Sequence, residues 1–331
     1  MHHAMQKTLF FLLAATIWSI WSACLAQEPD NQSSQKGMIV FHPVTSKVVK
    51  LANGIVADDK DWPTLFAAKF PDRAGICSGT LVGPNTFLLA AHCVDTPSGK
   101  PLGAQLLIGD RPIAMVCEMH PDYVKGDYQL QGTRSSEDFA LCLLDDDGKH
   151  PTAFANMSFE VIDAETPLKL GDPVLMTGFG CLTLKVSDGV LYPSRFDEAL
   201  RIGDEKIASS INKWHSYPAY ITTRSPEDSN PALCPGDSGG PLMSGVTTRA
   251  PKGKRRVRGV NSKICTVRRD DNYSMCASSG GTGTWDIVSV IAATGYPSFG
   301  QWAKDWIARN ADKKPIVCGL NSPAGVAPCR K

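Results

Sequence analysis

The stretch "ALCPGDSGGPL", residues 232–242, places a serine between an acid and a pair of glycines. Ser238 carries a hydroxyl group that becomes a useful nucleophile only when a neighbouring base takes its proton. Gly236 and Gly239 permit a tight turn whose backbone N–H groups point at one place, which is the arrangement that stabilises an oxyanion. Alone, the stretch also fits an ordinary glycine turn, so a nucleophilic site requires a base and an orienting acid elsewhere in the chain.

The candidate base is His92 in "LLAAHCV", residues 88–94, where it follows an apolar run and directly precedes Cys93. Cys77 lies 16 residues before Cys93. A bridge between these two cysteines would fix the histidine loop and would stabilise the fold by about 3 kcal/mol in the chain-entropy estimate. An isolated histidine is more often a surface or core residue, so His92 becomes informative only together with the other segments.

The candidate orienting acid is Asp138 in "SSEDFALCLL", residues 135–144. It opens an apolar run, so a strand would hold its carboxylate at a fixed, partly buried point. There it would accept a hydrogen bond from one imidazole nitrogen and leave the other nitrogen free for Ser238. Glu137 and the acids at 145–147 are alternatives, and for them we favour a solvated strand end.

Together these segments resemble the chymotrypsin/trypsin family of serine proteases. "LLAAHC" is similar to that family's "TAAHC", "EDFALCLL" to "DIALL", and "GDSGGPL" is the family's serine motif unaltered. "DWPTLFAAKF", "EMHPDY" and "TGFG" resemble three further family segments, and the likeness runs from about residue 51 to 310. It implies an all-β fold of two packed six-stranded antiparallel β-barrels with the active site between them. It also implies a triad of His92, Asp138 and Ser238, with the N–H groups of Gly236 and Ser238 as oxyanion donors.

The alternation of short apolar runs and turn residues along the chain also predicts two β-subdomains. Short apolar runs separated by Gly, Pro, Asn and Asp begin near residue 62, and a second series begins near residue 165, as in β-sandwiches or barrels. We place the seam near 151–165 and a C-terminal helix at 299–310, where tryptophans recur at helical spacing. Residues 311–331 then form a tail that contains two cysteines.

The N-terminal region predicts export and processing. Lys7 precedes an apolar run of 13 residues, which suits a secretory signal peptide over 1–26 and is too short to span a bilayer. Acylation at Cys24 is an alternative. Residues 27–50 are polar and resemble a short propeptide. The expected location is therefore secreted or periplasmic, with lipid anchoring at Cys24 as the second interpretation.

The resemblance also assigns a role to Asp237. In the family, the new amino terminus of the activated chain pairs with the buried acid before the serine. Leu51 lies 11 residues before Trp62, which matches the family interval, whereas Ile55 lies only 7 residues before it. We therefore predict activation by cleavage of the Lys50–Leu51 bond, carried out by another protease.

The family's pocket positions predict the substrate preference. Ala232 stands where trypsin-like members carry an aspartate, and Leu233 beside it should narrow the pocket. Ser262 matches the serine that supports the triad aspartate, and Ile264 replaces a glycine at the pocket entrance. We expect cleavage after small or medium apolar residues.

The cysteine set supports an oxidising compartment, because ten cysteines remain after the signal peptide is removed. We pair Cys77 with Cys93, and Cys318 with Cys329. Cys117 is paired with Cys142, because their strands are expected to be neighbours. The resemblance implies a bridge from Cys234 to Cys265 or Cys276, with Cys181 taking the remaining partner.

The net charge argues against two classes of partner, and two hypotheses about function remain. The net charge is +1, so no overall charge favours nucleic acid or an anionic membrane surface. We expect no cofactor, no metal and no membrane span, with protein or peptide substrates. The leading hypothesis is a secreted serine endopeptidase. The alternative is a catalytically weak protease homologue that serves as a binding or scaffold module. The basic stretch 249–259 is either a solvated hairpin or an exosite for an acidic partner.

Overall fold

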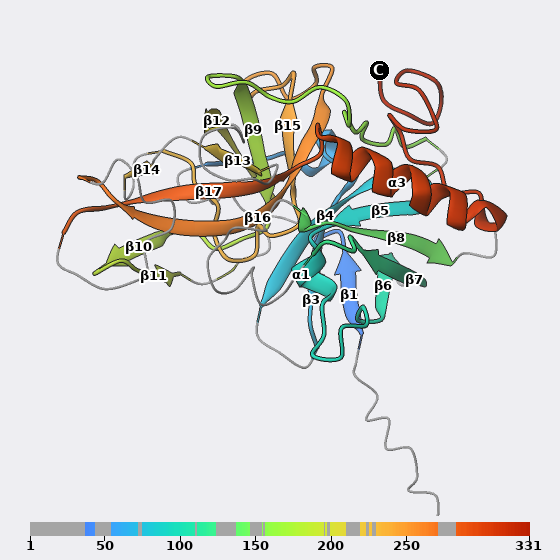
Figure 1. Cartoon of the computed structure of the whole chain (residues 1–331), viewed down its shortest axis with the longest axis horizontal. Coiled ribbons are helices and arrows are strands. Elements are labelled where there is room, and N and C mark those ends of the chain that lie inside the picture. The colour runs from blue at the N-terminus through green and yellow to red at the C-terminus, as the bar shows by residue number, and fades with distance from the viewer. Residues whose placement is uncertain are drawn as a thin grey trace, which may run out of the picture. The chain divides into compact units, whose positions relative to one another are not determined.

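Two β-barrels dominate the described part of the chain, as the sequence predicted (Figure 1). The computed structural model describes residues 37–43, 54–71, 75–109, 111–123, 137–145, 154, 156–194, 196, 199–209, 219–222, 225–226, 230–270 and 283–331. The predicted signal peptide, Cys24, Cys276 and the Lys50–Leu51 bond lie outside these ranges. Within the described ranges, no helix is long and apolar enough to cross a membrane.

The first barrel is closed by seven strands in the order β1-β3-β4-β5-β8-β7-β6, where six were predicted. Its strands are β1 (Met38–Phe41), β3 (Leu65–Lys69), β4 (Ile76–Gly83), β5 (Thr86–Leu89), β6 (Ala104–Ile108), β7 (Arg111–Met119) and β8 (Ala140–Asp145). The additional strand is β1, which lies in the segment that the sequence assigned to a propeptide. Because β1 pairs parallel with β6 and antiparallel with β3, this barrel is not purely antiparallel.

The second barrel is antiparallel and six-stranded, as predicted. Its order is β13-β12-β9-β15-β16-β17, and pairing of β13 with β17 closes it. Its strands are β9 (Pro173–Gly178), β12 (Arg201–Ser209), β13 (Ala219–Thr222), β15 (Pro241–Ser244), β16 (Arg256–Arg268) and β17 (Trp285–Ala293). Two short strands attach to it, β2 (Ile55–Val56) to β12 and β14 (Ser225–Pro226) to β17. A separate hairpin is formed by β10 (Leu184–Ser187) and β11 (Val190–Pro193).

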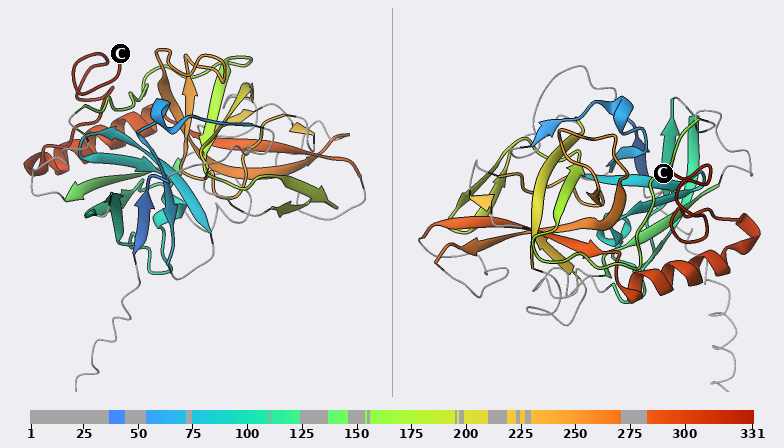
Figure 2. Two further views of the ribbon diagram at one scale, coloured as in Figure 1. Left: turned by 180° about the vertical axis from the view of Figure 1, so that it is seen from behind. Right: turned by 90° about the horizontal axis from the view of Figure 1, so that it is seen from above.

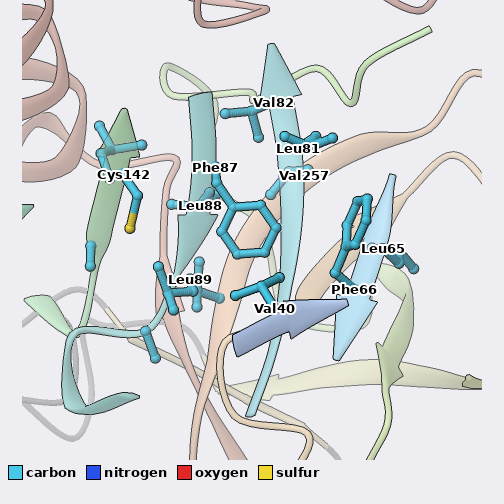
Figure 3. Packing of buried hydrophobic residues seen from close by; sticks show 14 of the residues in the cluster. Val40, Leu65, Phe66, Leu81, Val82, Phe87, Leu88, Leu89, Cys142 and Val257 are labelled. Carbon is cyan, nitrogen blue, oxygen red and sulfur yellow. The ribbon is translucent and has the colours of Figure 1, made fainter. Parts of the chain in front are cut away.

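The core of the first barrel is built from side chains of several strands that meet inside it. Phe66 of β3 and Phe87 of β5 pack edge to face with ring centroids 6.0 Å apart. Val40 of β1 lies beside both rings, and Leu81 and Val257 close the same cluster (Figure 3). Because every labelled side chain here is fully or almost fully buried, this packing fixes the strands that carry the candidate histidine loop.

The C-terminal helix α3 (Pro297–Arg309) follows the last strand of the second barrel but packs along the first (Figures 1 and 2). Proline at its first turn suits a helix start. Phe299, Trp302 and Trp306 recur on its buried face, and the helical spacing of the two tryptophans is the one that the sequence predicted. Phe299 lies 4.7 Å from the Phe139 ring, centroid to centroid, so the helix supports the residue that follows Asp138.

A buried ion pair lies beside the predicted seam. Glu160 accepts hydrogen bonds from Arg255 at 2.6 and 2.9 Å and from Thr64 Oγ1 at 2.6 Å. The Arg255 guanidinium also stacks over the Trp62 ring at 3.9 Å. Glu160 and Arg255 are both at most 1% exposed, and Arg258 of the same basic stretch pairs with Asp163. The stretch 249–259 is therefore not a uniformly solvated hairpin, because two of its arginines are buried and paired.

Disulfides staple the fold at four places among the described residues. The bridges Cys77–Cys93, Cys117–Cys142 and Cys318–Cys329 are those that the sequence predicted. The fourth joins Cys181 to Cys234, which corrects the expected pairing of Cys234 with Cys265 or Cys276. Cys181 follows directly after the "TGFG" segment, and its N–H donates to Pro235 O at 3.0 Å, so the packing of this segment against the serine turn selects the partner.

Candidate active site

His92 lies on a single helical turn, α1 (Ala91–Val94), immediately after β5. The Cys77–Cys93 bridge ties this turn to β4, so the position of the imidazole is fixed from two strands. The His92 side chain keeps 19% of its surface exposed. The imidazole is therefore accessible from solvent while its backbone is anchored.

Asp138 supports His92 from a fully buried position just before β8. Its Oδ2 lies 2.7 Å from Nδ1 of His92, and its Oδ1 accepts the backbone N–H of His92 at 2.9 Å. Ser262 Oγ donates to Oδ2 at 2.7 Å. Because a carboxylate oxygen accepts, the contact places the proton of the neutral ring on Nδ1 and leaves Nε2 as the basic nitrogen. The structure thus brings together His92, Asp138 and Ser262, three of the site residues named from the sequence.

The serine turn is fastened to the histidine loop through the backbone. Ser238 O accepts the N–H of Ser78 at 2.7 Å. Cys93 Sγ lies 3.7 Å from that same oxygen and 3.9 Å from Nε2 of His92. The basic nitrogen of His92 and the backbone oxygen of Ser238 therefore both lie within 4 Å of one sulfur atom. Ser238 itself is half-buried, which suits a candidate nucleophile.

Ser78 is a positioning residue that the sequence analysis missed. Its Oγ donates to Gly236 O at 2.8 Å and accepts from the N–H of Phe179 at 3.0 Å. One buried hydroxyl on β4 of the first barrel thereby holds the serine turn and the "TGFG" segment of the second. The one sequence signal that could have identified it is its position directly after Cys77.

The turn leaves two backbone donors unused. Within the described part of the chain, the N–H groups of Gly236 and Ser238 donate to no protein acceptor. Gly236 has φ +103°, a region that disfavours other residues, and a Cβ there would lie 2.8 Å from Gly180 Cα. A Cβ at Gly239 would lie 2.2 Å from Ser78 O. The glycines are thus required by backbone conformation and by close approach, and the free amides fit an oxyanion site.

Asp237 points away from this chemistry into the protein. Its Oδ1 accepts the N–H of Gly180 at 2.7 Å, and its Oδ2 accepts the N–H of Cys234 at 2.8 Å. A Cβ at Gly178 or at Gly180 would lie 2.2 or 2.6 Å from Oδ1, so the two glycines of "TGFG" make room for this carboxyl. Burial raises the pKa of Asp237 to about 7 despite these hydrogen bonds. Its predicted partner, Leu51, lies outside the described residues.

The predicted pocket residues line an apolar region of the second barrel. Ala232 and Leu233 are each 2% exposed, and half-buried Ile264 packs against the clusters that contain them. Ser289 was not anticipated. It pairs with Ile264 across β16 and β17, and its Oγ accepts the N–H of Leu233 at 3.0 Å. A register shift between Asn261 and Lys263 places Ile264 opposite Ser289. No local sequence signal predicts this pairing.

One cluster near the site has metal-like spacing. The ligand atoms of Cys77, His92 and Cys93 lie within 4.8 Å of one another. Both sulfurs belong to a disulfide, so neither is available as the thiolate that a metal site uses. The cluster is therefore the disulfide that holds the histidine loop, with His92 beside it.

Comparison with known proteins supplies the family. The family described as Trypsin matches residues 52–279. The chain belongs to the trypsin family. Chymotrypsin-like elastase family member 1 of Macaca fascicularis is 25% identical over 234 residues, covering 66% of this chain and 82% of that protein. Human kallikrein-8 is 28% identical over 215 residues, covering 60% and 76%.

A solved structure shares the fold of this chain. Mouse neuropsin, described as a serine protease expressed in the limbic system of the brain, aligns with a TM-score of 0.50 at 20% identity. The alignment covers 77% of this chain and 98% of neuropsin. At this identity the likeness supports the fold.

Proposed function

We propose that this trypsin-family chain is a serine endopeptidase in which Ser238 is the nucleophile and His92 the base. The observation that carries the proposal is the 2.7 Å contact between His92 Nδ1 and Asp138 Oδ2 beside the serine turn. Nε2 of His92 takes the proton of Ser238 Oγ as that oxygen attacks the substrate carbonyl. Asp138 orients the ring and stabilises the imidazolium that forms.

The acyl transfer then proceeds in two steps. The N–H groups of Gly236 and Ser238 receive the oxyanion of the tetrahedral intermediate. The imidazolium of His92 returns its proton to the leaving amine, and an acyl group remains on Ser238. Water deprotonated by His92 then hydrolyses that ester, releasing the carboxylic acid and restoring the serine.

The proposed substrate preference is for small or medium apolar residues before the scissile bond. Ala232, Leu233 and Ile264 offer hydrocarbon, and none of them offers a charge. A lysine or arginine side chain would lose hydration there without gaining a counter-charge. The preference follows from this imbalance.

We further propose that the enzyme is exported as a zymogen and activated at Lys50–Leu51 by another protease. Hydrolysis adds one water and leaves a carboxylate on Lys50 and an amino group on Leu51. That amino group would pair with Asp237, whose burial otherwise disfavours its charge. Ile55 is a poorer start, because it is 47% exposed and pairs with Ile202 in the sheet. Four structural disulfides fit an oxidising compartment.

Labelling with a serine-directed phosphonate probe tests the catalytic proposal. The chain is cleaved at Lys50–Leu51 and then exposed to the probe, beside a Ser238→Ala control and an Asp138→Asn variant. We expect stoichiometric labelling at Ser238, no labelling of the control, and slow labelling of Asp138→Asn because its histidine lacks support. A folded, cleaved chain that is not labelled would favour the binding or scaffold alternative.

A further inference from the structure

Strand β1 occupies a slot between β3 and β6 that closes the first barrel. Three residues of β1 pair antiparallel with β3, from Ile39 opposite Lys69 to Phe41 opposite Ala67. Its other edge pairs parallel with β6 over four residues, from Met38 opposite Ala104 to Phe41 opposite Leu107. Closure of the barrel therefore runs through β1, and its removal would expose two strand edges at once.

The side chains of β1 alternate as those of a core strand. Met38 and Val40 are fully buried, while Ile39 and Phe41 are half-buried on the opposite face. Val40 lies against the Phe66 and Phe87 rings (Figure 3). Burial of two apolar side chains of this size stabilises the barrel, because it removes their hydrocarbon surface from water. This strand is thus part of the core and not a loosely attached leader.

Contacts at both ends of β1 hold it in register. At the start, the N–H of Met38 donates to Gly103 O at 2.8 Å. A Cβ on Gly37 would lie 2.5 Å from that same oxygen, so glycine permits this close approach. At the far end, the His42 ring packs edge-on against Phe66 with centroids 5.6 Å apart. These contacts hold β1 in the observed register.

This strand lies on the N-terminal side of the proposed activation bond. Resting on that proposed cleavage, we propose that the segment containing β1 is not released on activation. It stays bound in the slot between β3 and β6, and the active enzyme is a complex of two chains. Recognition is that of an extended apolar strand added to a sheet, with main-chain hydrogen bonds on both edges. Residues 27–50 contain no cysteine, so retention is non-covalent.

Controlled cleavage tests this proposal without using the chain's own activity. In a chain from residue 27 that carries Ser238→Ala, residues 46–49 are changed to aspartate, which creates an enteropeptidase site cut after Lys50. The cut protein is passed over a size-exclusion column, and its peak is analysed by intact mass. We expect the 27–50 fragment to co-elute in equimolar amount with the 51–331 chain, and to separate in concentrated guanidinium chloride. Elution of the free fragment apart from a folded 51–331 chain would overturn the proposal.

Matched variants on the two faces of β1 show whether the slot retains the fragment. Val40→Asp buries a carboxyl among aromatic rings and should release the fragment after cleavage. Ile39→Asp places the same group on the half-buried face and should leave most of it bound. If Val40→Asp does not fold, Val40→Ala is used in its place. For Val40→Ala we expect the melting temperature of the uncut chain to fall by roughly 5 °C. Equal retention of both aspartate variants, or an unshifted melting temperature for Val40→Ala, would contradict the inference.

The outcomes separate this inference from the proposed function. The retention assay depends on an added protease and on mass, so a chain without catalytic activity gives the same result. N-terminal sequencing of the naturally processed protein reports independently on the Lys50–Leu51 cleavage. A retained fragment with a different natural start would leave β1 as a structural strand and refute only the activation site.

Discussion

The uncut chain should lose stability as pH rises, because Asp237 is buried without a full counter-charge. Burial raises its pKa from the ordinary 3.8 to about 7. Between these values the folded chain holds a proton that the unfolded chain has released, so stability falls with increasing pH over this window and is constant above it. The gap between the two pKa values corresponds to roughly 4 kcal/mol, of which roughly 3 kcal/mol falls between pH 4.5 and 8.

The substitution Asp237→Asn isolates this effect. Both proteins carry Ser238→Ala to prevent self-cleavage, and urea unfolding is measured from pH 4.5 to 8. Asparagine presents one acceptor where the carboxylate presents two, so one N–H loses its partner at a cost of about 1–3 kcal/mol at every pH. All other groups titrate alike in both proteins. The stability of Asp237→Asn relative to its parent should therefore rise by roughly 3 kcal/mol from pH 4.5 to 8.

The same pair of proteins gives a second comparison after cleavage at Lys50. An amino group on Leu51 that pairs with Asp237 stabilises the ionised carboxylate, so the parent should no longer lose stability with rising pH near neutrality. If the difference between parent and Asp237→Asn changes by less than about 1 kcal/mol over the range in the uncut chain, the reasoning on burial is refuted. If cleavage leaves the pH trend unchanged, the activation pair is refuted.

Three further substitutions probe other contacts. Ser262→Ala removes a donor from Asp138 and should lower kcat about tenfold with little change in KM; an unchanged kcat on a peptide substrate would contradict this support role. Glu160→Gln leaves Arg255 buried without its counter-charge and should lower the free energy of unfolding by about 3–5 kcal/mol, whereas a urea-unfolding loss below about 1 kcal/mol would contradict it. Ala232→Asp should introduce cleavage after Arg or Lys in peptide profiling, and an unaltered profile would show that this position is not the pocket base.

The candidate site residues named from the sequence are those whose local conformation is determined by short segments. His92 beside Cys93, Asp138 before an apolar run, and Ser238 in a glycine turn each carry their geometry locally. A strand end or tight turn needs few distant contacts to define it. For the same reason, the Cys77–Cys93 bridge and the helix over 299–310 were predictable, and the structure contains both.

What the sequence did not predict depends on pairing between distant segments. The run "MIVF" at 38–41 is apolar, but nothing local shows which strands it pairs with, and it becomes β1 through its pairing with β3 and β6. The choice of Cys181 as the partner of Cys234 follows from the packing of "TGFG" against the serine turn. In each case the deciding contact lies in the tertiary structure.

The two strands that flank the proposed activation bond belong to different barrels, and this gives cleavage a physical consequence. On one side β1 is bound in the first barrel; on the other, Val56 of β2 pairs with Arg201 of the second. Arg201 donates to Gly180 O at 3.3 Å, and the N–H of Gly180 binds Asp237. Three residues lie between Leu51 and Ile55, so their Cα atoms are at most about 14 Å apart, and β2 holds the new terminus within a short reach of its own strand. Cleavage would therefore release a tether between barrels and leave the free end beside the strand that leads, through Arg201 and Gly180, to the buried acid.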